Sequence, residues 1–170
     1  MKIRYFQETD TLYIEFRQSP VAETRDLDEN TQVDFDERGG ICAMNRAAKY
    51  AKERIVFDRP IGQNQAIQHP LAANWMALEA ANLMVFKAAW LYDSGKPSGA
   101  EANAAKYLAG EAGFDACQQA VMTHGGFGYA KEYHVERYLR ESLVGRIAPV
   151  TPQMILCFIA ERVLGLPNSY

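Results

Sequence analysis

The sequence predicts a mainly helical α+β protein, in which a small antiparallel β-meander precedes an up-and-down bundle of four or five helices. Apolar residues alternate with period two up to about residue 43, and afterwards they recur every three or four residues. The charge balance changes at the same place. Residues 1–43 hold five basic and ten acidic side chains, whereas residues 44–170 hold thirteen and eleven. We therefore expect two domains, 1–43 and 44–170.

The N-terminal segment has the pattern of short, half-buried strands. Leu12, Ile14 and Phe16 alternate with polar neighbours, and Val33 with Phe35 marks a later strand. Three or four such strands are too few to be stable alone. We therefore expect this meander to pack on another surface or on a second copy of the chain.

The C-terminal segment has the pattern of amphipathic helices joined by short connections, which predicts an antiparallel bundle. The expected helices cover residues 44–56, 63–93, a stretch from the Ser98 cap to about 124, 135–147, and 151 to just before Gly165. Ser98 and Glu101 would form a capping box, and Thr151 followed by Pro152 is a typical helix start. The long helix at 63–93 carries two apolar stripes, so we expect neighbours on two of its sides. One stripe comprises Leu71, Trp75, Leu78, Asn82, Val85 and Ala89, and the other Met76, Leu83 and Trp90.

Composition excludes several classes of protein. The chain has 170 residues, is 48% hydrophobic and carries a formal charge of −3, which argues against disorder, nucleic-acid binding and anionic membranes as partners. It contains no signal-peptide pattern and no apolar run long enough to span a bilayer. The cysteines Cys42, Cys117 and Cys157 lack CxxC spacing, which is typical of reduced thiols in a cytoplasmic protein. The three histidines lie far apart without ligand spacing, so we expect no metal site.

An ordered series of motifs runs through the helical segment. Residues 50–65 read YAKERIVFDRPIGQNQ, residues 88–95 AAWLYDSG, residues 124–129 HGGFGY and residues 160–167 AERVLGLP. In this order they resemble the C-terminal helical domain of flavin-dependent acyl-CoA dehydrogenases. Residues 1–43 are similar to a small bacterial β-rich family of unknown function whose usual closing segment is missing. The chain thus resembles a fusion of a truncated β module with a dehydrogenase domain.

The resemblance implies a role in FAD binding and in assembly. In that family the bundle forms the core of a tetramer and completes the flavin site of a neighbouring subunit, so we expect a homo-oligomer. The residues that the resemblance assigns to the adenosine diphosphate half of FAD are Arg54, Phe57, Gln65, Gly125 and Gly126, and Thr151 would lie beside the flavin. A guanidinium suits a pyrophosphate, and an aromatic ring can stack on adenine. Each residue also has a purely structural interpretation: a helix stop for the glycines, an N-cap for Thr151 and a solvated cation for Arg54.

Three departures from the family pattern bear on activity. Met122 stands where many members have glutamine, and Asp58 where they have glycine. Pro149 occupies the position of the glutamate that removes the substrate's α-proton, and it cannot accept a proton. The resemblance assigns residues 129–141 to a motif that locks helices together, so we interpret the acids within it as structural: Glu132, Glu136 and Glu141.

The sequence therefore predicts an acyl-CoA dehydrogenase-like domain that keeps part of the FAD site but is inactive alone. We expect FAD binding to be weak or absent in this chain, and an acyl-CoA ligand follows only by analogy. One alternative is a non-catalytic module for oligomerisation or partner docking. Another is a small regulator built on the β module, with the helices as a carrier.

Overall fold

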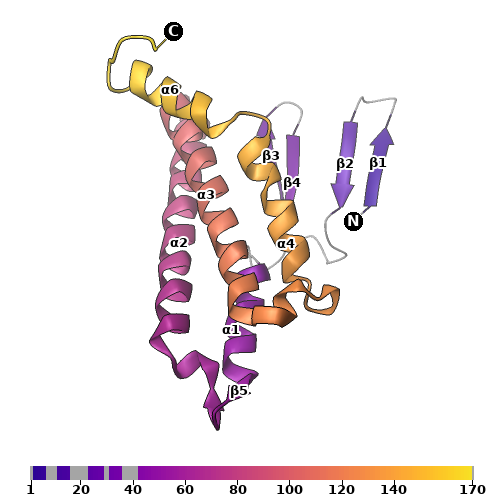
Figure 1. The fold of residues 1–170 in the computed structure, drawn as a ribbon. Helices are drawn as coiled ribbons and strands as arrows, with labels where there is room; N and C mark the ends of the chain where they lie inside the picture. Colours follow the sequence, from indigo (N-terminus) through magenta and orange to yellow (C-terminus); the bar gives the residue numbers. More distant parts are fainter. Residues whose placement is uncertain (1, 7–10, 16–22, 29–30, 36–41, 170) are drawn as a thin grey trace. The chain divides into compact units, whose positions relative to one another are not determined.

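The computed structural model describes residues 2–6, 11–15, 23–28, 31–35 and 42–169. It confirms the mainly helical α+β class, with strands before residue 40 and a helical bundle after it (Figure 1). Contacts divide the chain into two units, Met1–Gly40 and Ile41–Tyr170.

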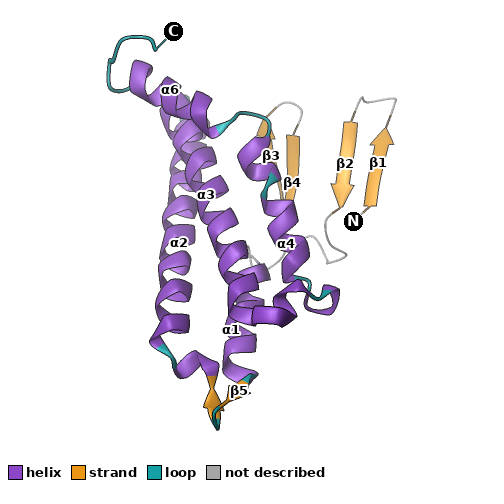
Figure 2. Ribbon diagram, viewed as in Figure 1, coloured by secondary structure: helices purple, strands orange, loops and turns teal. Residues whose placement is uncertain are grey.

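The N-terminal unit contains two β-hairpins. Its strands are β1 (Lys2–Phe6), β2 (Thr11–Glu15), β3 (Glu23–Asp28) and β4 (Thr31–Phe35). Strand β1 pairs antiparallel with β2, with Ile3 opposite Ile14, and β3 pairs antiparallel with β4 (Figure 2). The described strands form two separate two-stranded ladders, whereas the sequence predicted one meander. Of the predicted strand residues, Phe16 lies outside the described ranges.

The C-terminal unit is a bundle in which two long antiparallel helices are joined by a short turn. Its helices are α1 (Cys42–Glu53), α2 (Gln65–Asp93), α3 (Gly99–His124), α4 (Val135–Ser142), α5 (Val144–Ile147) and α6 (Pro152–Arg162). Short 3-10 helices connect them: η1 (Ile61–Gln63), η2 (Gly125–Tyr129) and η3 (Lys131–Tyr133). Helices α1, α2 and α4 all pack on α3, which is the central element.

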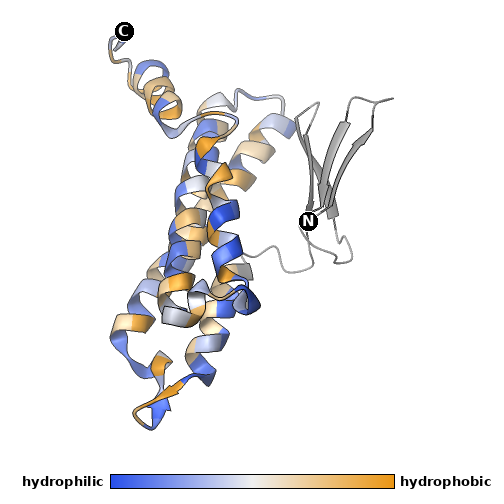
Figure 3. Cartoon of the chain, turned by 45° about the vertical axis from the view of Figure 1, so that its right-hand side comes forward, coloured by the Kyte–Doolittle hydropathy of each residue, from blue (hydrophilic) through white to orange (hydrophobic). Residues whose placement is uncertain are grey.

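Small side chains fill the centre of the bundle. The buried cluster consists of Ala43, Ala47, Cys117, Ala120 and Val135, from α1, α3 and α4. Alanines let these helices approach closely, and larger residues such as Leu71 and Leu139 pack around them. Apolar and polar residues are interspersed along the helices (Figure 3), and many large apolar side chains are solvent-exposed.

Two predicted helices end differently in the structure. The first was expected to reach Val56 but ends at Glu53, because Ile55–Val56 (β5) pairs with Arg59–Pro60 (β6) in a tight hairpin. The helix expected at 135–147 is interrupted between α4 and α5. This interruption accompanies a close approach of α3, since a Cβ on Gly110 would lie 2.8 Å from the carbonyl oxygen of Gly145.

One predicted cap forms and one does not. The Thr151 hydroxyl accepts a hydrogen bond from the Met154 amide at 3.4 Å, which confirms the expected start of α6. Ser98 does precede α3, but its side chain makes no cap bond, because its backbone (φ −126°, ψ 3°) is not extended. Glu101 instead pairs with Lys87 of α2 at 3.1 Å, and this ammonium lowers the pKa of the Glu101 carboxyl.

Only part of the predicted apolar pattern of α2 is packed within the chain. Leu71 and Leu78 lie on the packed face with buried Ala81. The second stripe is solvent-exposed, at 59% for Met76, 70% for Leu83 and 58% for Trp90. Most of the first stripe is exposed as well, at 59% for Trp75 and 36% for Val85, with Asn82 and Ala89 also exposed. Phe86 is a further exposed aromatic residue of α2. Within the described residues, α2 therefore packs through Leu71, Leu78 and Ala81, and most of both predicted stripes has no covering neighbour.

Residues 135–162 match a membrane span by length and composition alone. The fold divides them among α4, α5 and α6, and the longest of these has 11 residues. A spanning helix needs about 20.

Candidate functional site

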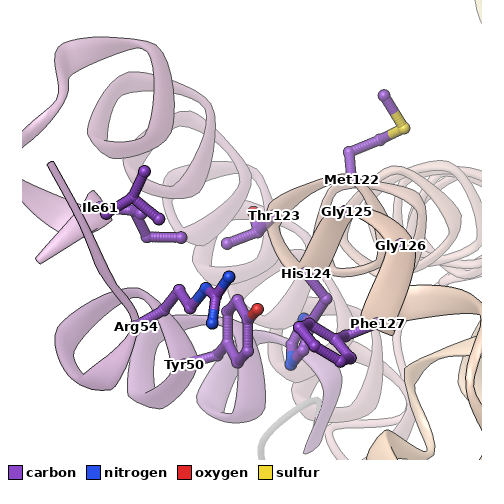
Figure 4. Close-up of a pocket in the computed structure, with 10 residues that line it drawn as sticks. Tyr50, Arg54, Ile61, Met122, Thr123, His124, Gly125, Gly126 and Phe127 are labelled. Carbon is purple, nitrogen blue, oxygen red and sulfur yellow. The ribbon is translucent and has the colours of Figure 1, made fainter.

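A pocket of about 420 Å³ lies where the end of α1, the β5–β6 hairpin and the end of α3 meet (Figure 4). The residues that line it are Tyr50, Arg54, Val56, Ile61, Met122, Thr123, His124, Gly125, Gly126 and Phe127. None of these ten side chains carries a carboxylate, and Arg54 contributes a permanent positive charge. The pocket therefore favours an anionic ligand.

Arg54 is held at the junction of α1 and the hairpin by its backbone. Its amide donates to the Tyr50 carbonyl at 2.8 Å, and its carbonyl accepts from the Ile61 amide at 2.9 Å. The guanidinium carbon lies 5.4 Å from the centre of the Phe127 ring, within cation–π range. This arrangement places a planar, charged donor beside an aromatic face.

The glycine pair opens the other wall of the pocket. Gly125 ends α3 with φ 60° and ψ −134°, a conformation that essentially only glycine adopts. A Cβ added to Gly125 or to Gly126 would meet no atom within 4 Å, so both backbones face open space. The Gly125 amide already bonds to the carbonyls of Val121 and Met122. A phosphate approaching this wall would therefore not find that amide free.

An aromatic cluster that the sequence did not predict forms the floor of the pocket. The His124 ring stacks on Tyr50 with centroids 4.2 Å apart and planes 24° apart, and it meets the Tyr133 ring edge-on at 5.6 Å. Phe127 lies 5.3 Å from Tyr133. The Nδ1 of His124 donates to the Ala120 carbonyl at 2.7 Å, a tautomer assigned from the acceptor. Burial, with a smaller contribution from the nearby Arg46 charge, lowers the pKa of His124.

Three of the four members of this cluster belong to motifs noted in the sequence. Tyr50 opens the first motif, and His124 and Phe127 belong to HGGFGY. Their stacking could not be predicted, because it depends on how α1 packs against the end of α3. His124 is buried at the end of α3, with only 5% of its surface exposed.

The structure brings together three of the six predicted cofactor residues: Arg54, Gly125 and Gly126. Phe57 is 93% exposed at the hairpin turn, and Gln65 is exposed at the first residue of α2; neither lines the pocket. Thr151 lies at the other end of the bundle, at the start of α6 (Figure 1). A Cβ on Gly99, the first residue of α3, would touch Phe158 of α6, and α3 extends about 39 Å from there to the pocket.

The structure gives the positions of the three residues that differ from the family pattern. Met122 lies at the pocket rim with 68% of its surface exposed. Asp58 has a φ of 61°, a left-handed conformation that glycine adopts more readily. Pro149 is exposed in the segment before α6, and two of the acids near it in sequence form ion pairs, Glu136 with Arg140 and Glu141 with Arg137. Within the described residues, no group of three or more His, Cys, Asp or Glu side chains could hold a metal.

Comparison with known proteins assigns each half of the chain. Residues 39–164 match the model of the acyl-CoA dehydrogenase C-terminal domain, and residues 2–45 match a family described as a protein of unknown function, DUF2283. Acyl-CoA dehydrogenase FadE12 of Mycobacterium tuberculosis is 47% identical over 133 residues, which cover 77% of this chain and 34% of the relative. The 3-(aryl)acrylate reductase of Clostridium sporogenes is 41% identical over 123 residues, covering 72% and 33%.

Solved structures agree with this assignment. Butyryl-CoA dehydrogenase from Megasphaera elsdenii superposes with a TM-score of 0.70 at 34% identity, over 72% of this chain and 32% of the other. The FAD complex of PigA gives 0.72 at 30% identity, over 75% and 33%. The chain spans about a third of the length of these relatives, and the match lies in its helical unit. The chain therefore belongs to the acyl-CoA dehydrogenase family, through the C-terminal helical domain of these FAD-dependent enzymes.

Proposed function

We propose that the helical unit supplies a binding surface for the adenosine diphosphate half of FAD, and that the chain alone does not oxidise acyl-CoA. The observation that carries this proposal is the Arg54 pocket with its two glycines. FAD-bound relatives such as PigA give the ligand class.

The pocket residues fit a diphosphate attached to an aromatic base. Arg54 would bind the diphosphate through its planar fork of donors, which matches phosphate oxygens. Gly125 and Gly126 would leave room for the ligand, because side chains there would project into open space. The flavin itself, when bound in such enzymes, accepts a hydride. The residues of this chain would bind and orient the distant half of the cofactor.

Two observations support the proposal that this chain alone does not oxidise acyl-CoA. Pro149 offers no base at the position of the family's glutamate, and Glu136 and Glu141 are engaged in ion pairs. The full length of α3 separates Thr151 from the Arg54 pocket. One extended cofactor would not reach both, so Thr151 and Arg54 would serve two different FAD molecules in an assembly.

A calorimetric titration with ADP-ribose tests the binding site, because this ligand carries the adenosine diphosphate group without a flavin. We expect Arg54→Gln to weaken binding about tenfold or more, the usual scale for losing a charge-assisted pair. Arg162→Gln is the matched control, since it removes one exposed positive charge on α6 away from the pocket.

Three results would contradict the proposal. Equal affinity of the native chain and Arg54→Gln for ADP-ribose, or no binding at all, would show that the Arg54 pocket is not a diphosphate-binding site. Purified chain that contains flavin and bleaches on addition of an acyl-CoA would show that the chain is catalytic alone.

A second candidate function, assembly without catalysis, is favoured by the exposed apolar stripe of α2. We infer that a second copy covers this stripe in antiparallel orientation, centred on Leu83. Glu79 and Lys87 lie four residues on either side of Leu83, and Met76 and Trp90 lie seven residues on either side. This pairing would set Glu79 level with Lys87, which also pairs with Glu101 of its own chain, and apolar residue level with apolar residue, as an isologous interface requires.

Light scattering distinguishes this candidate. We expect the native chain to be a dimer or larger and Leu83→Glu to be a folded monomer, with circular dichroism confirming its helix content. Leu166→Glu, at an exposed apolar position after α6, is the control that should stay associated. A native chain that is monomeric would exclude assembly through α2.

A further inference from the structure

We propose that His124 is a positioning residue of the Arg54 pocket that takes up a proton when a diphosphate binds, so that diphosphate binding tightens as the pH falls. This inference rests on the proposed function, because it concerns the same pocket. It assigns a role to a buried titratable group that the family resemblance leaves without one.

The His124 ring lies at the centre of the pocket floor. It is sandwiched between stacking on Tyr50 and the edge of Tyr133, and its Nδ1 is fixed by the Ala120 carbonyl. These contacts are compatible with both charge states, since Nδ1 carries its proton in each of them. The added proton would enter at Nε2 without any rearrangement of the ring. Binding and protonation can therefore be coupled through charge alone.

The charges around the ring decide which state is favoured. From α1, Arg46 lies close enough to act on the imidazole, Tyr50 stacks on it, and Arg54 lines the same pocket. From η2 and η3, the uncharged rings of Phe127 and Tyr133 complete the surroundings. Both neighbouring charges are positive, and no pocket-lining residue is acidic.

The ligand itself would therefore supply the missing negative charge. Without it, a third cation beside Arg46 and Arg54 is unfavourable at this buried ring, and burial keeps the pKa of His124 low. A diphosphate held by Arg54 would reverse this balance and raise the pKa of His124. By linkage, affinity must then rise as the pH falls, by at most about tenfold per pH unit for one proton.

ADP-ribose is the suitable probe, because its diphosphate is a diester and lacks the phosphomonoester ionisation near pH 6 that would confuse the measurement. Nuclear magnetic resonance would follow the ring proton of His124 between about pH 5 and 8, with and without ligand. We expect the pKa of His124 to rise on binding, while the exposed His69 serves as an internal control. Calorimetry in two buffers of different ionisation enthalpy would measure the proton taken up.

Two variants separate charge from packing. His124→Phe keeps a ring for stacking on Tyr50, and His124→Asn keeps a short donor near the Ala120 carbonyl. Neither can titrate, so both should lose the pH dependence of ADP-ribose affinity and the proton uptake. A purely structural role would change affinity by the same factor at every pH.

The outcomes are distinguishable. Tight binding with an unchanged pKa of His124, or a pH dependence that persists in both variants, would overturn this inference and leave the proposed function intact. No binding of ADP-ribose at any pH would overturn both.

Discussion

Replacing Phe57 with asparagine should stabilise the folded chain, although the change removes a large apolar side chain. Phe57 and Asp58 form the two-residue turn between β5 and β6, with φ of 50° and 61°. Two consecutive positive φ angles are typical of the type I′ turn, which favours Asn-Gly. Phenylalanine in this conformation costs about 1–2 kcal/mol, and asparagine tolerates it far better.

The substitution loses little free energy of apolar contact. Of the roughly 200 Å² that a Phe side chain offers, only about 15 Å² is covered here, because the residue is 93% exposed. Losing that contact costs about 0.4 kcal/mol. The net expectation is a rise of about 1 kcal/mol in the free energy of unfolding, or about 2–4 °C in Tm for a chain of this size. Arg54 connects the hairpin to α1 by backbone hydrogen bonds, so the local stabilisation should appear in the free energy of unfolding of the whole helical unit.

Thermal and urea unfolding followed by circular dichroism measure the effect. Tyr129→Asn is the matched control, since Tyr129 is 89% exposed and is not among the described residues with positive φ. We expect that variant to gain nothing. If Phe57→Asn were no more stable than the native chain, the turn would not be strained as its backbone angles imply. A stabilised variant with weakened FAD binding would show that the strain is retained for a functional aromatic residue.

Three further predictions concern packing, capping and pH. Gly128→Ala should lower the free energy of unfolding, measured by urea titration, by about 1–3 kcal/mol, because its Cβ would lie 2.4 Å from the Val121 carbonyl oxygen. Gly126→Ala is the control and should be nearly neutral, because its Cβ would meet no atom within 4 Å. Thr151→Ala should cost about 1 kcal/mol and Thr151→Ser should not, as unfolding curves would show. The pKa of His124 is lowered on folding, so the unfolded chain binds the proton more readily. In the absence of ligand, the free energy of unfolding should therefore be highest above about pH 6.5 and decrease as the pH falls through the lowered pKa. A free energy of unfolding that does not change with pH, as expected for His124→Phe, would contradict this.

Local patterns predicted the long helices well, because their periodicity and caps are properties of neighbouring residues. The start of α6 follows from Thr151 and Pro152 alone, and the structure confirms it. The β5–β6 hairpin was missed because its turn residues, Phe57 and Asp58, are not the Asn-Gly pair that identifies such turns in sequence. Only the backbone angles of the folded chain reveal the turn.

In the candidate site, only those residues could be predicted whose chemical type suggests a role by itself. Arg54 and the glycine pair could be proposed from the motifs, and the structure places them around one pocket. The stacking of His124 on Tyr50 joins helices that are distant in sequence, so no local pattern encodes it. Similarly, the two stripes of α2 were visible in sequence, but periodicity does not say which of their residues meet a neighbour in the same chain.

On the proposed function, the separation of Arg54 and Thr151 implies that FAD binding by this chain depends on association. Both residues are assigned to FAD by the family resemblance, yet α3 holds them at opposite ends of a bundle about 39 Å long. On the proposed function, each end meets a different cofactor, and each cofactor needs groups from another polypeptide. The exposed stripe of α2 offers apolar surface for such a contact. Leu83→Glu therefore provides a joint test: if assembly completes the site, the variant should lose added FAD while keeping the ADP-ribose affinity of its intact Arg54 pocket.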